Sequence, residues 1–293
     1  MKKVKLFIAL LLLLQFTACS EKDSQLYVKN IEITKENEIY NFIVSYYDFS
    51  SPKENYIKTV YTSENIFSAG MYAVSDKDYN FRLCENVLLS PLIISKDINN
   101  AISLINSLRI PVTTNILCYD GETDHDDVVI EKLTENPLYN FNIENNNVTA
   151  SIPAFSEDGW IGTFIVYSGK PVIFLDKNQQ SVLSMINRNT ENIRLVLKEG
   201  QVIVNLDNIQ TYFCSKADNF IINMNIHVKD CKGINNWNKN KNHVINMVSN
   251  EVKNILSDLY NNVTICEIHN LLWYENQQGR RYENIVYDIN VTR

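Results

Sequence analysis

The sequence predicts an α+β protein in which groups of β-strands alternate with α-helices. Three observations predict this fold class. Many short segments alternate apolar and polar residues, which is the period of a half-buried strand. Other segments place apolar residues every three or four positions, and the strongest of these runs from residue 240 to 260. Only 8 glycines and 6 prolines occur in 293 residues, which favours compact loops between regular elements.

The first eighteen residues are predicted to be a signal peptide. Three lysines, Lys2, Lys3 and Lys5, precede an unbroken apolar run from Leu6 to Leu14. A charged start, a short apolar core and a small-residue exit are typical of secretory leaders. The apolar run is too short to span a bilayer, because a membrane-spanning helix needs roughly 20 apolar residues.

Cys19 is the predicted lipid attachment site. Phe16–Cys19 (FTAC) resembles a bacterial lipobox, in which an aliphatic residue and two small residues precede the lipidated cysteine; here Phe16 replaces the usual leucine. A diacylglycerol thioether, with acyl chains such as palmitate, would hold the mature protein to a membrane, since each buried CH₂ contributes about 0.8 kcal/mol. The alternative is an ordinary secreted protein with an incidental cysteine.

The mature chain is acidic and long enough for two domains. Removing residues 1–18 leaves 275 residues, and the loss of three leader lysines changes the net charge from −7 to −10. An acidic surface argues against a nucleic-acid partner and against a polybasic grip on anionic lipid. We expect an N-terminal α+β domain at 19–150 and a C-terminal one at 151–293, connected by the Asn-rich, irregular segment 135–153.

In the first half, a helix over 64–76 is expected to begin at an N-cap, Ser63, and to bury one face. That face carries Ile66, Phe67, Met71 and Val74. Pro91 interrupts an apolar run at 86–95 and indicates a bulge or an edge strand. The remaining predicted strands are 26–33, 41–47, 56–61 and 113–118, and the remaining helices are 97–108 and 127–135.

In the second half, a tight turn at 168–171 separates two strands, and Asp176 caps the helix that follows. The helix at 240–260 carries a continuous apolar stripe, which is predicted to pack on a sheet as core; a groove for a partner helix is the alternative. The predicted strands are 160–167, 172–175, 193–197, 201–206, 220–228 and 284–291, and the other helix is 177–187.

The sequence predicts no catalytic residue, no metal site and no cofactor. No GxSxG, P-loop, GxGxxG or HExxH motif occurs, and the four histidines are scattered. The acidic stretch 120–127 lacks calcium-loop spacing and is interpreted as a solvated loop. His227 is expected on the solvent face of a strand. The cysteines besides Cys19 are interpreted as small buried hydrophobes without disulfides: Cys84, Cys118, Cys214, Cys231 and Cys266.

The ordered elements resemble the Ger(x)C family, the lipoprotein C subunit of spore-germinant receptors. Beyond the lipobox, the likeness is carried by 63–67 with 78–83 and 87–95, by 152–186, and by the helix 240–260 with its closing strand. The chain is shorter than usual members. Pro171-Val172-Ile173 lacks the glycine common after the valine, and the Gly-rich Asp-Ile-Phe segment near the C-terminus is missing.

This resemblance implies successive sheets flanked by helices and a non-enzymatic role in assembly or coupling. It implies a location on the outer face of the spore inner membrane, beside integral-membrane receptor subunits that recognise nutrient germinants. Two other classes remain open: a solute-binding lipoprotein of a transporter, which needs two α/β lobes, and a surface hydrolase, which needs a clustered nucleophile and base.

Overall fold

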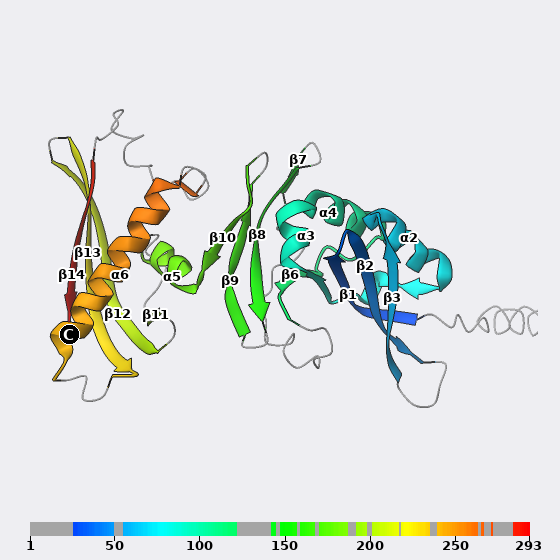
Figure 1. Ribbon diagram of the computed structural model, residues 1–293, viewed down its shortest axis with the longest axis horizontal. Helices are drawn as coiled ribbons and strands as arrows, with labels where there is room; N and C mark the ends of the chain where they lie inside the picture. The colour runs from blue at the N-terminus through cyan, green and yellow to red at the C-terminus, as the bar shows by residue number, and fades with distance from the viewer. Residues whose placement is uncertain are drawn as a thin grey trace, which may run out of the picture. The chain divides into compact units, whose positions relative to one another are not determined.

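A computed structural model describes most of the mature chain. It covers residues 26–49, 55–121, 142–144, 147–156, 159–167, 170–186, 192–197, 201–216, 218–234, 239–262, 265–266, 271 and 284–293. The signal peptide, Cys19, the predicted helix 127–135 and most of the acidic stretch lie outside these residues. The chain divides into two compact units between Ile116 and Leu117. Figure 1 labels the helices and strands of both units. The boundary predicted at residues 150 and 151 lies inside a strand, β8 (Asn147–Ser156).

Unit 1 is a sheet with helices packed on it. Its strands are β1 (Leu26–Glu36), β2 (Ile39–Asp48), β3 (Asn55–Ser63), the short β4 (Tyr79–Asn80), β5 (Asn86–Leu89) and the start of β6 (Asn115–Tyr119). The order is β6-β5-β1-β2-β3, with β2 antiparallel to β1 and β3, and β5 parallel to β1. Helices α2 (Ile66–Asp76) and α3 (Pro91–Lys96) contact these strands, and α4 (Ile98–Ser107) packs on α2.

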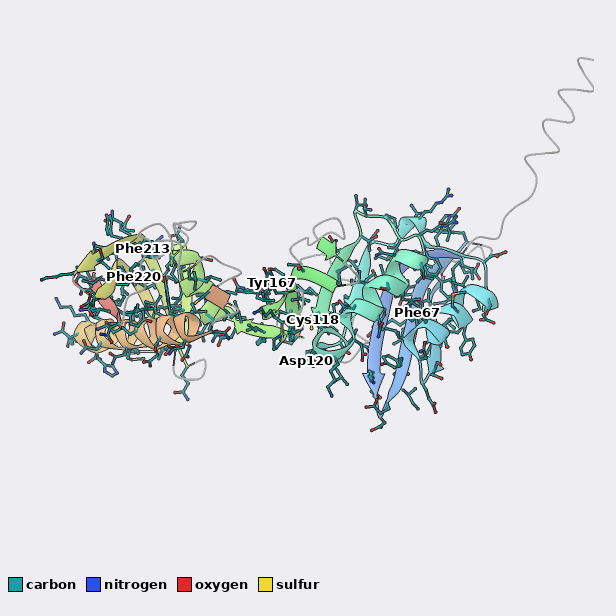
Figure 2. The ribbon with its side chains drawn as sticks, turned by 90° about the horizontal axis from the view of Figure 1, so that it is seen from above. Phe67, Cys118, Asp120, Tyr167, Phe213 and Phe220 are labelled. Atoms are coloured by element: carbon teal, nitrogen blue, oxygen red, sulfur yellow. The ribbon has the colours of Figure 1, made fainter. Side chains whose placement is uncertain are left out.

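The N-cap predicted for α2 was wrong, and the predicted buried face was right only for Ile66. The helix begins at Ile66, and the Asn65 side chain caps it by accepting from the backbone N–H of Phe67 (2.9 Å) and Ser68 (3.2 Å). Its buried residues are Ile66, Ala69, Gly70 and Ala73. A Cβ on Gly70 would lie 2.6 Å from Leu104 Cδ1, so α4 approaches α2 along its small residues. The larger apolar side chains are therefore exposed: Phe67, which Figure 2 labels, Met71 and Val74 are between 37% and 53% exposed.

Pro91 begins a helix, where the sequence predicted a bulge or an edge strand. β5 ends at Leu89, and Pro91 is the first residue of α3. Proline suits this position because its fixed φ matches the helix and the first helical N–H needs no partner. Helix α4 lies within the range 97–108 predicted for a helix, and it buries Ile98, Ile102 and Ile105.

Unit 2 contains two groups of strands. In the first, β8 pairs with β9 (Gly159–Val166) and with the short β7 (Asn142–Glu144), and β9 pairs with β10 (Ile173–Asp176), all antiparallel. The expectation of an irregular segment over 135–153 was therefore wrong for residues 142–144 and 147–153. Val148, Ile152 and Ala154 are buried on β8. Their apolar pattern is short and follows several asparagines, so the sequence alone did not indicate a strand here.

The second group is a four-stranded sheet covered by helices. Its order is β11 (Asn192–Leu197), β12 (Val202–Lys216), β13 (Asn219–Lys232) and β14 (Asn284–Thr292), with β14 parallel to β13. Helix α5 (Lys177–Ile186) contacts β11, and the long helix α6 (Lys241–Asn261) contacts β14 and α5. These observations confirm the α+β class.

Helix α6 packs on the sheet with its apolar stripe as core, as the sequence predicts. Its buried residues face the inner side of the sheet, where Ile222, Met224, Ile226 and Val228 alternate along β13 and are also buried. Phe213 and Phe220 stack nearby, with ring centroids 5.9 Å apart (Figure 2). The buried residues of α6 are Val244, Val248, Val252, Ile255, Leu256, Leu259 and Tyr260.

Candidate functional site

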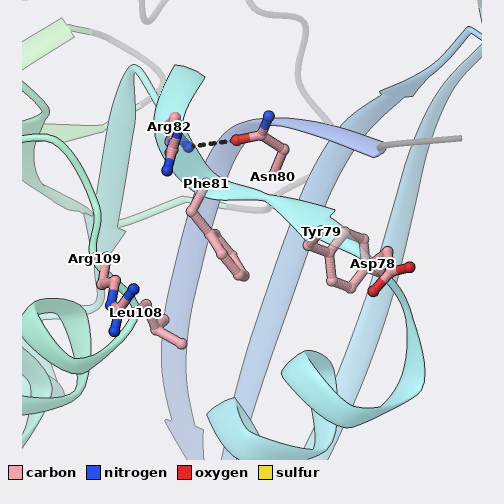
Figure 3. Close-up of a pocket in the computed structure, with 7 residues that line it drawn as sticks. All are labelled: Asp78, Tyr79, Asn80, Phe81, Arg82, Leu108 and Arg109. Carbon is pink, nitrogen blue, oxygen red and sulfur yellow. Dashed lines mark hydrogen bonds between the residues drawn. The ribbon is translucent and has the colours of Figure 1, made fainter. Parts of the chain in front are cut away.

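A cleft in unit 1 is the candidate site (Figure 3). Its volume is about 470 Å³, and it lies beside the point at which the described chain begins. The backbone N–H of Leu26 donates to the Asp78 carbonyl (3.3 Å), and Leu26 is paired with Tyr79. The residues that line the cleft are Asp78, Tyr79, Asn80, Phe81, Arg82, Leu108 and Arg109.

Local backbone structure places two arginines in the cleft. Asn80 accepts from the backbone N–H of Arg82 (3.0 Å) and so starts the short 3₁₀ helix η1 (Phe81–Leu83). Arg109 lies just past the end of α4 with φ of 56°. This left-handed conformation usually belongs to glycine, because a side chain there costs roughly 1–2 kcal/mol. Arg109 therefore holds a position where a glycine would be less strained.

A hydrogen-bonded tyrosine pair forms the other end of the cleft. The hydroxyl oxygens of Tyr79 and Tyr61 lie 2.8 Å apart, and the Tyr61 hydroxyl donates to Asp76 Oδ2 (2.8 Å). Burial, together with the hydrogen bonds to Tyr79 and Asp76, raises the pKa of Tyr61. Figure 3 shows Asp78 at this end and the two arginines at the other.

The chemistry of the cleft is that of a small anion site. Among the described residues, neither Arg82 nor Arg109 forms a salt bridge. Guanidinium groups match the geometry of carboxylates and phosphates, so this end of the cleft suits an anionic group. The other polar groups of the lining are the Asp78 carboxylate, the Tyr79 hydroxyl and the Asn80 amide.

Unit 2 has a second cleft, of about 590 Å³, between α5 and β11. The helix beside it starts with a reciprocal cap: Asp176 Oδ1 accepts from the Gln179 N–H (2.8 Å), and Gln179 Oε1 accepts from the Asp176 N–H (3.0 Å). The predicted cap at Asp176 is thus confirmed. The lining is mostly amide, hydroxyl and cationic: Trp160, Lys177, Gln180, Ser181, Ser184, Asn192, Ile193, Arg194 and Val196.

Of the histidine and acidic residues singled out in the sequence, the structure describes His227, whereas most of the acidic stretch 120–127 lies outside the described residues. His227 faces away from the core of unit 2 and contacts the carboxylate of Asp207 across the strand pair β12–β13. Within the part of the chain that the structure describes, no three histidine, cysteine or acidic side chains are grouped to hold a metal. The helices in that part include none long and apolar enough to cross a membrane.

The five cysteines of the mature chain beyond Cys19 are all free thiols, and four of them are buried. Burial raises the pKa of the Cys84 thiol to about 12 and that of Cys118 to about 12. The exception is Cys214, which is exposed on β12 although it follows the apolar Phe213. The interpretation of all five as buried residues was therefore wrong for Cys214.

Native alkylation is expected to modify Cys214 and to spare the four buried cysteines. Alkylation needs an accessible thiolate, and burial removes both access and charge. Intact mass of an unlipidated chain of residues 20–293 should show one adduct in buffer and five in denaturant. The Cys214→Ser variant should show no adduct in buffer. A denatured mass with fewer than five adducts would contradict the absence of disulfides.

The chain is thus an α+β protein with two compact units and a cleft in each. No family model matches the chain, and no curated protein is similar to it in sequence. Among solved structures, the chain is similar to the crystal structure of the GerBC protein, with a TM-score of 0.44 and 12% identity. That likeness covers 89% of this chain and 96% of the other.

Sequence reasoning missed the arginine cleft. Arg82 and Arg109 are separated by α3, α4 and β5, and only the folded sheet brings them together. A local signal existed for each: Asn80 two residues before Arg82 is a capping arrangement, and Arg109 directly follows a helix.

Proposed function

We propose that the protein is a membrane-anchored lipoprotein subunit of a spore nutrient-germinant receptor, with a role in assembly or coupling. The observation that carries the proposal is the leader ending in Cys19 followed by a chain whose elements resemble the Ger(x)C family. Within that likeness, residues 152–186 form a strand pair followed by α5, and residues 241–261 form α6, which precedes β14. The proposed partners are the integral-membrane receptor subunits.

The proposed location is the outer face of the spore inner membrane. The mature chain has a net charge of −10, so electrostatic attraction to anionic lipid gives it no help. Two or three acyl chains on Cys19 would supply the attachment, since each buried CH₂ contributes about 0.8 kcal/mol. Attachment also raises the effective concentration of the subunits for one another, so that modest contacts suffice.

A binding role fits the described chemistry better than catalysis does. Both clefts are lined largely by hydrogen-bonding and cationic groups, and the hydroxyls of Ser181 and Ser184 in the second cleft donate to backbone carbonyls. The alternative of a solute-binding lipoprotein needs two α/β lobes, in which parallel strands alternate with helices. Two of the three strand pairings in the second sheet of unit 2 are antiparallel, which disfavours that alternative.

A deletion strain tests the proposed function. Its spores are expected to form normally but to respond poorly to at least one nutrient germinant, because the receptor lacks a subunit. Chemical triggers that bypass receptors should still work. Complementation with the intact gene should restore the nutrient response, and complementation with a Cys19→Ala gene should not. A normal nutrient response in the deletion, with no paralogue to substitute, would eliminate the proposal.

A further inference from the structure

Four aromatic side chains gather at one end of the sheet in unit 1, where β1 begins, β2 ends and β3 begins. The register pairs Tyr27 with Tyr47 and Tyr47 with Tyr56, so three tyrosines form a row across the strands. Phe49 follows the last residue of β2. Its ring centroid lies 5.5 Å from that of Tyr27 and 5.9 Å from that of Tyr47, and Tyr47 lies 5.4 Å from Tyr56. We call these four residues the aromatic cluster.

The aromatic cluster is exposed yet held in place. Phe49 is 57% exposed and Tyr56 is 37% exposed. The Asn30 amide donates to the Tyr56 hydroxyl (3.3 Å), and the same Asn30 accepts from the amide of Asn86 (3.0 Å). Lys29 Nζ lies 5.8 Å from the centre of the Tyr47 ring. The rings are thus positioned before any partner arrives, so binding through them costs little ordering.

The aromatic cluster also lies at the place where the chain arrives from the predicted lipid attachment site. Tyr27 is the second residue of β1, and only residues 20–25 separate Cys19 from Leu26. Even a fully extended segment of this length reaches only about 25 Å. An acyl group on Cys19 therefore keeps this end of the sheet close to the bilayer, whatever path the segment takes.

We propose that the aromatic cluster lies against the surface of the lipid bilayer and orients unit 1 on it. This inference rests on the acyl anchor of the proposed function. Tyrosine and phenylalanine favour the membrane interface, because the ring enters the acyl boundary while the tyrosine hydroxyl remains among the headgroups. A chain of net charge −10 has no general attraction to anionic lipid, so an aromatic contact is the chemistry available here.

Quenching by brominated lipid tests the contact. The mature chain, residues 19–293 with Cys214→Ser, is coupled through Cys19 to a maleimide lipid in phosphatidylcholine vesicles with brominated acyl chains. Cys214 is replaced because it is the exposed thiol of the described residues. One variant carries Phe49→Trp and its control carries Ile39→Trp. Ile39 is also exposed, at 44%, but starts β2, about 33 Å from Phe49 at the strand rise of about 3.3 Å per residue.

After the fluorescence of the parent chain is subtracted, the tryptophan at position 49 is expected to be quenched about threefold more than the tryptophan at position 39. Adding Tyr27→Ser and Tyr56→Ser to Phe49→Trp should at least halve that quenching while the circular dichroism stays unchanged. Equal quenching at 39 and 49 would overturn the inference, and so would quenching that survives loss of both tyrosines in a folded chain. Because the coupling is chemical, this result is independent of whether cells acylate Cys19, which fatty-acid labelling decides separately.

Discussion

Replacing Val248 by aspartate is expected to abolish soluble expression of the mature protein. Val248 lies in the middle of α6 with no exposed surface, within the core that joins α6 to α5 and the four-stranded sheet. Truncating a large core aliphatic side chain to alanine typically costs about 2–5 kcal/mol, and a buried unpaired carboxylate should cost no less. Whole domains are stable by only about 5–15 kcal/mol, so the substitution removes much of the available stability.

Lys253 provides the matched control on the same helix. It is exposed and lies five residues after Val248, on the outer face of α6. Lys253→Ala should therefore express normally and melt within a few degrees of the parent, because surface substitutions usually change the stability by less than about 0.5 kcal/mol. Soluble yield and thermal melting by circular dichroism measure both variants. Equal stability of the two would contradict the observed burial of the α6 stripe.

Elements with a regular period and no competing constraint were predictable. The stripe of α6 and the strict alternation along β13 each require a single buried face, and both faces bury the residues that the sequence predicts. The N-cap of α5 was also predictable, because Asp176 lies directly before the first helical residue, Lys177. Such features depend on residues close in sequence, which is why a single sequence reveals them.

The failures arise where tertiary packing overrides local hydrophobicity. In α2, ranking residues by apolar size favoured Phe67 and Met71 for the core, but α4 packs close against Gly70 and leaves no room for them. In β12, the alternation breaks where Asn208 takes a φ of 49° and the register shifts, so residues beyond 206 did not resemble a strand. The arginine cleft and the aromatic cluster depend on strand pairing and so carry little local signal.

The structure changes what the exposed apolar residues imply. Phe67, Met71 and Val74, predicted as core, are a surface stripe on α2, and the aromatic cluster is a second exposed patch in the same unit. Unit 1 thus carries both of these apolar surfaces, and it also contains the described residues nearest in sequence to Cys19. For a protein proposed to work beside membrane subunits, this makes unit 1 the first place to search for contacts with partners or lipid.

Replacing Cys19 by alanine is expected to release the protein from membranes or leave it unprocessed. Without the thiol, no acyl chain can be attached, and the contribution of about 0.8 kcal/mol per buried CH₂ is lost. In the described residues no helix can take over as a membrane span, and the net charge of −10 disfavours binding to anionic lipid. Cells grown with a clickable fatty acid and then fractionated provide the measurement.

The matched control for that experiment is Cys214→Ser, because Cys214 is the exposed thiol among the described residues and the likeliest competitor for acylation. The parent and Cys214→Ser should carry label and sediment with membranes, whereas Cys19→Ala should carry none. The leader explains the difference, since Cys19 alone follows the short apolar run and small residues that a lipoprotein peptidase requires. Label that persists in Cys19→Ala would contradict acylation at Cys19. It would also contradict the proposed location and the six-residue tether that brings the aromatic cluster to the bilayer.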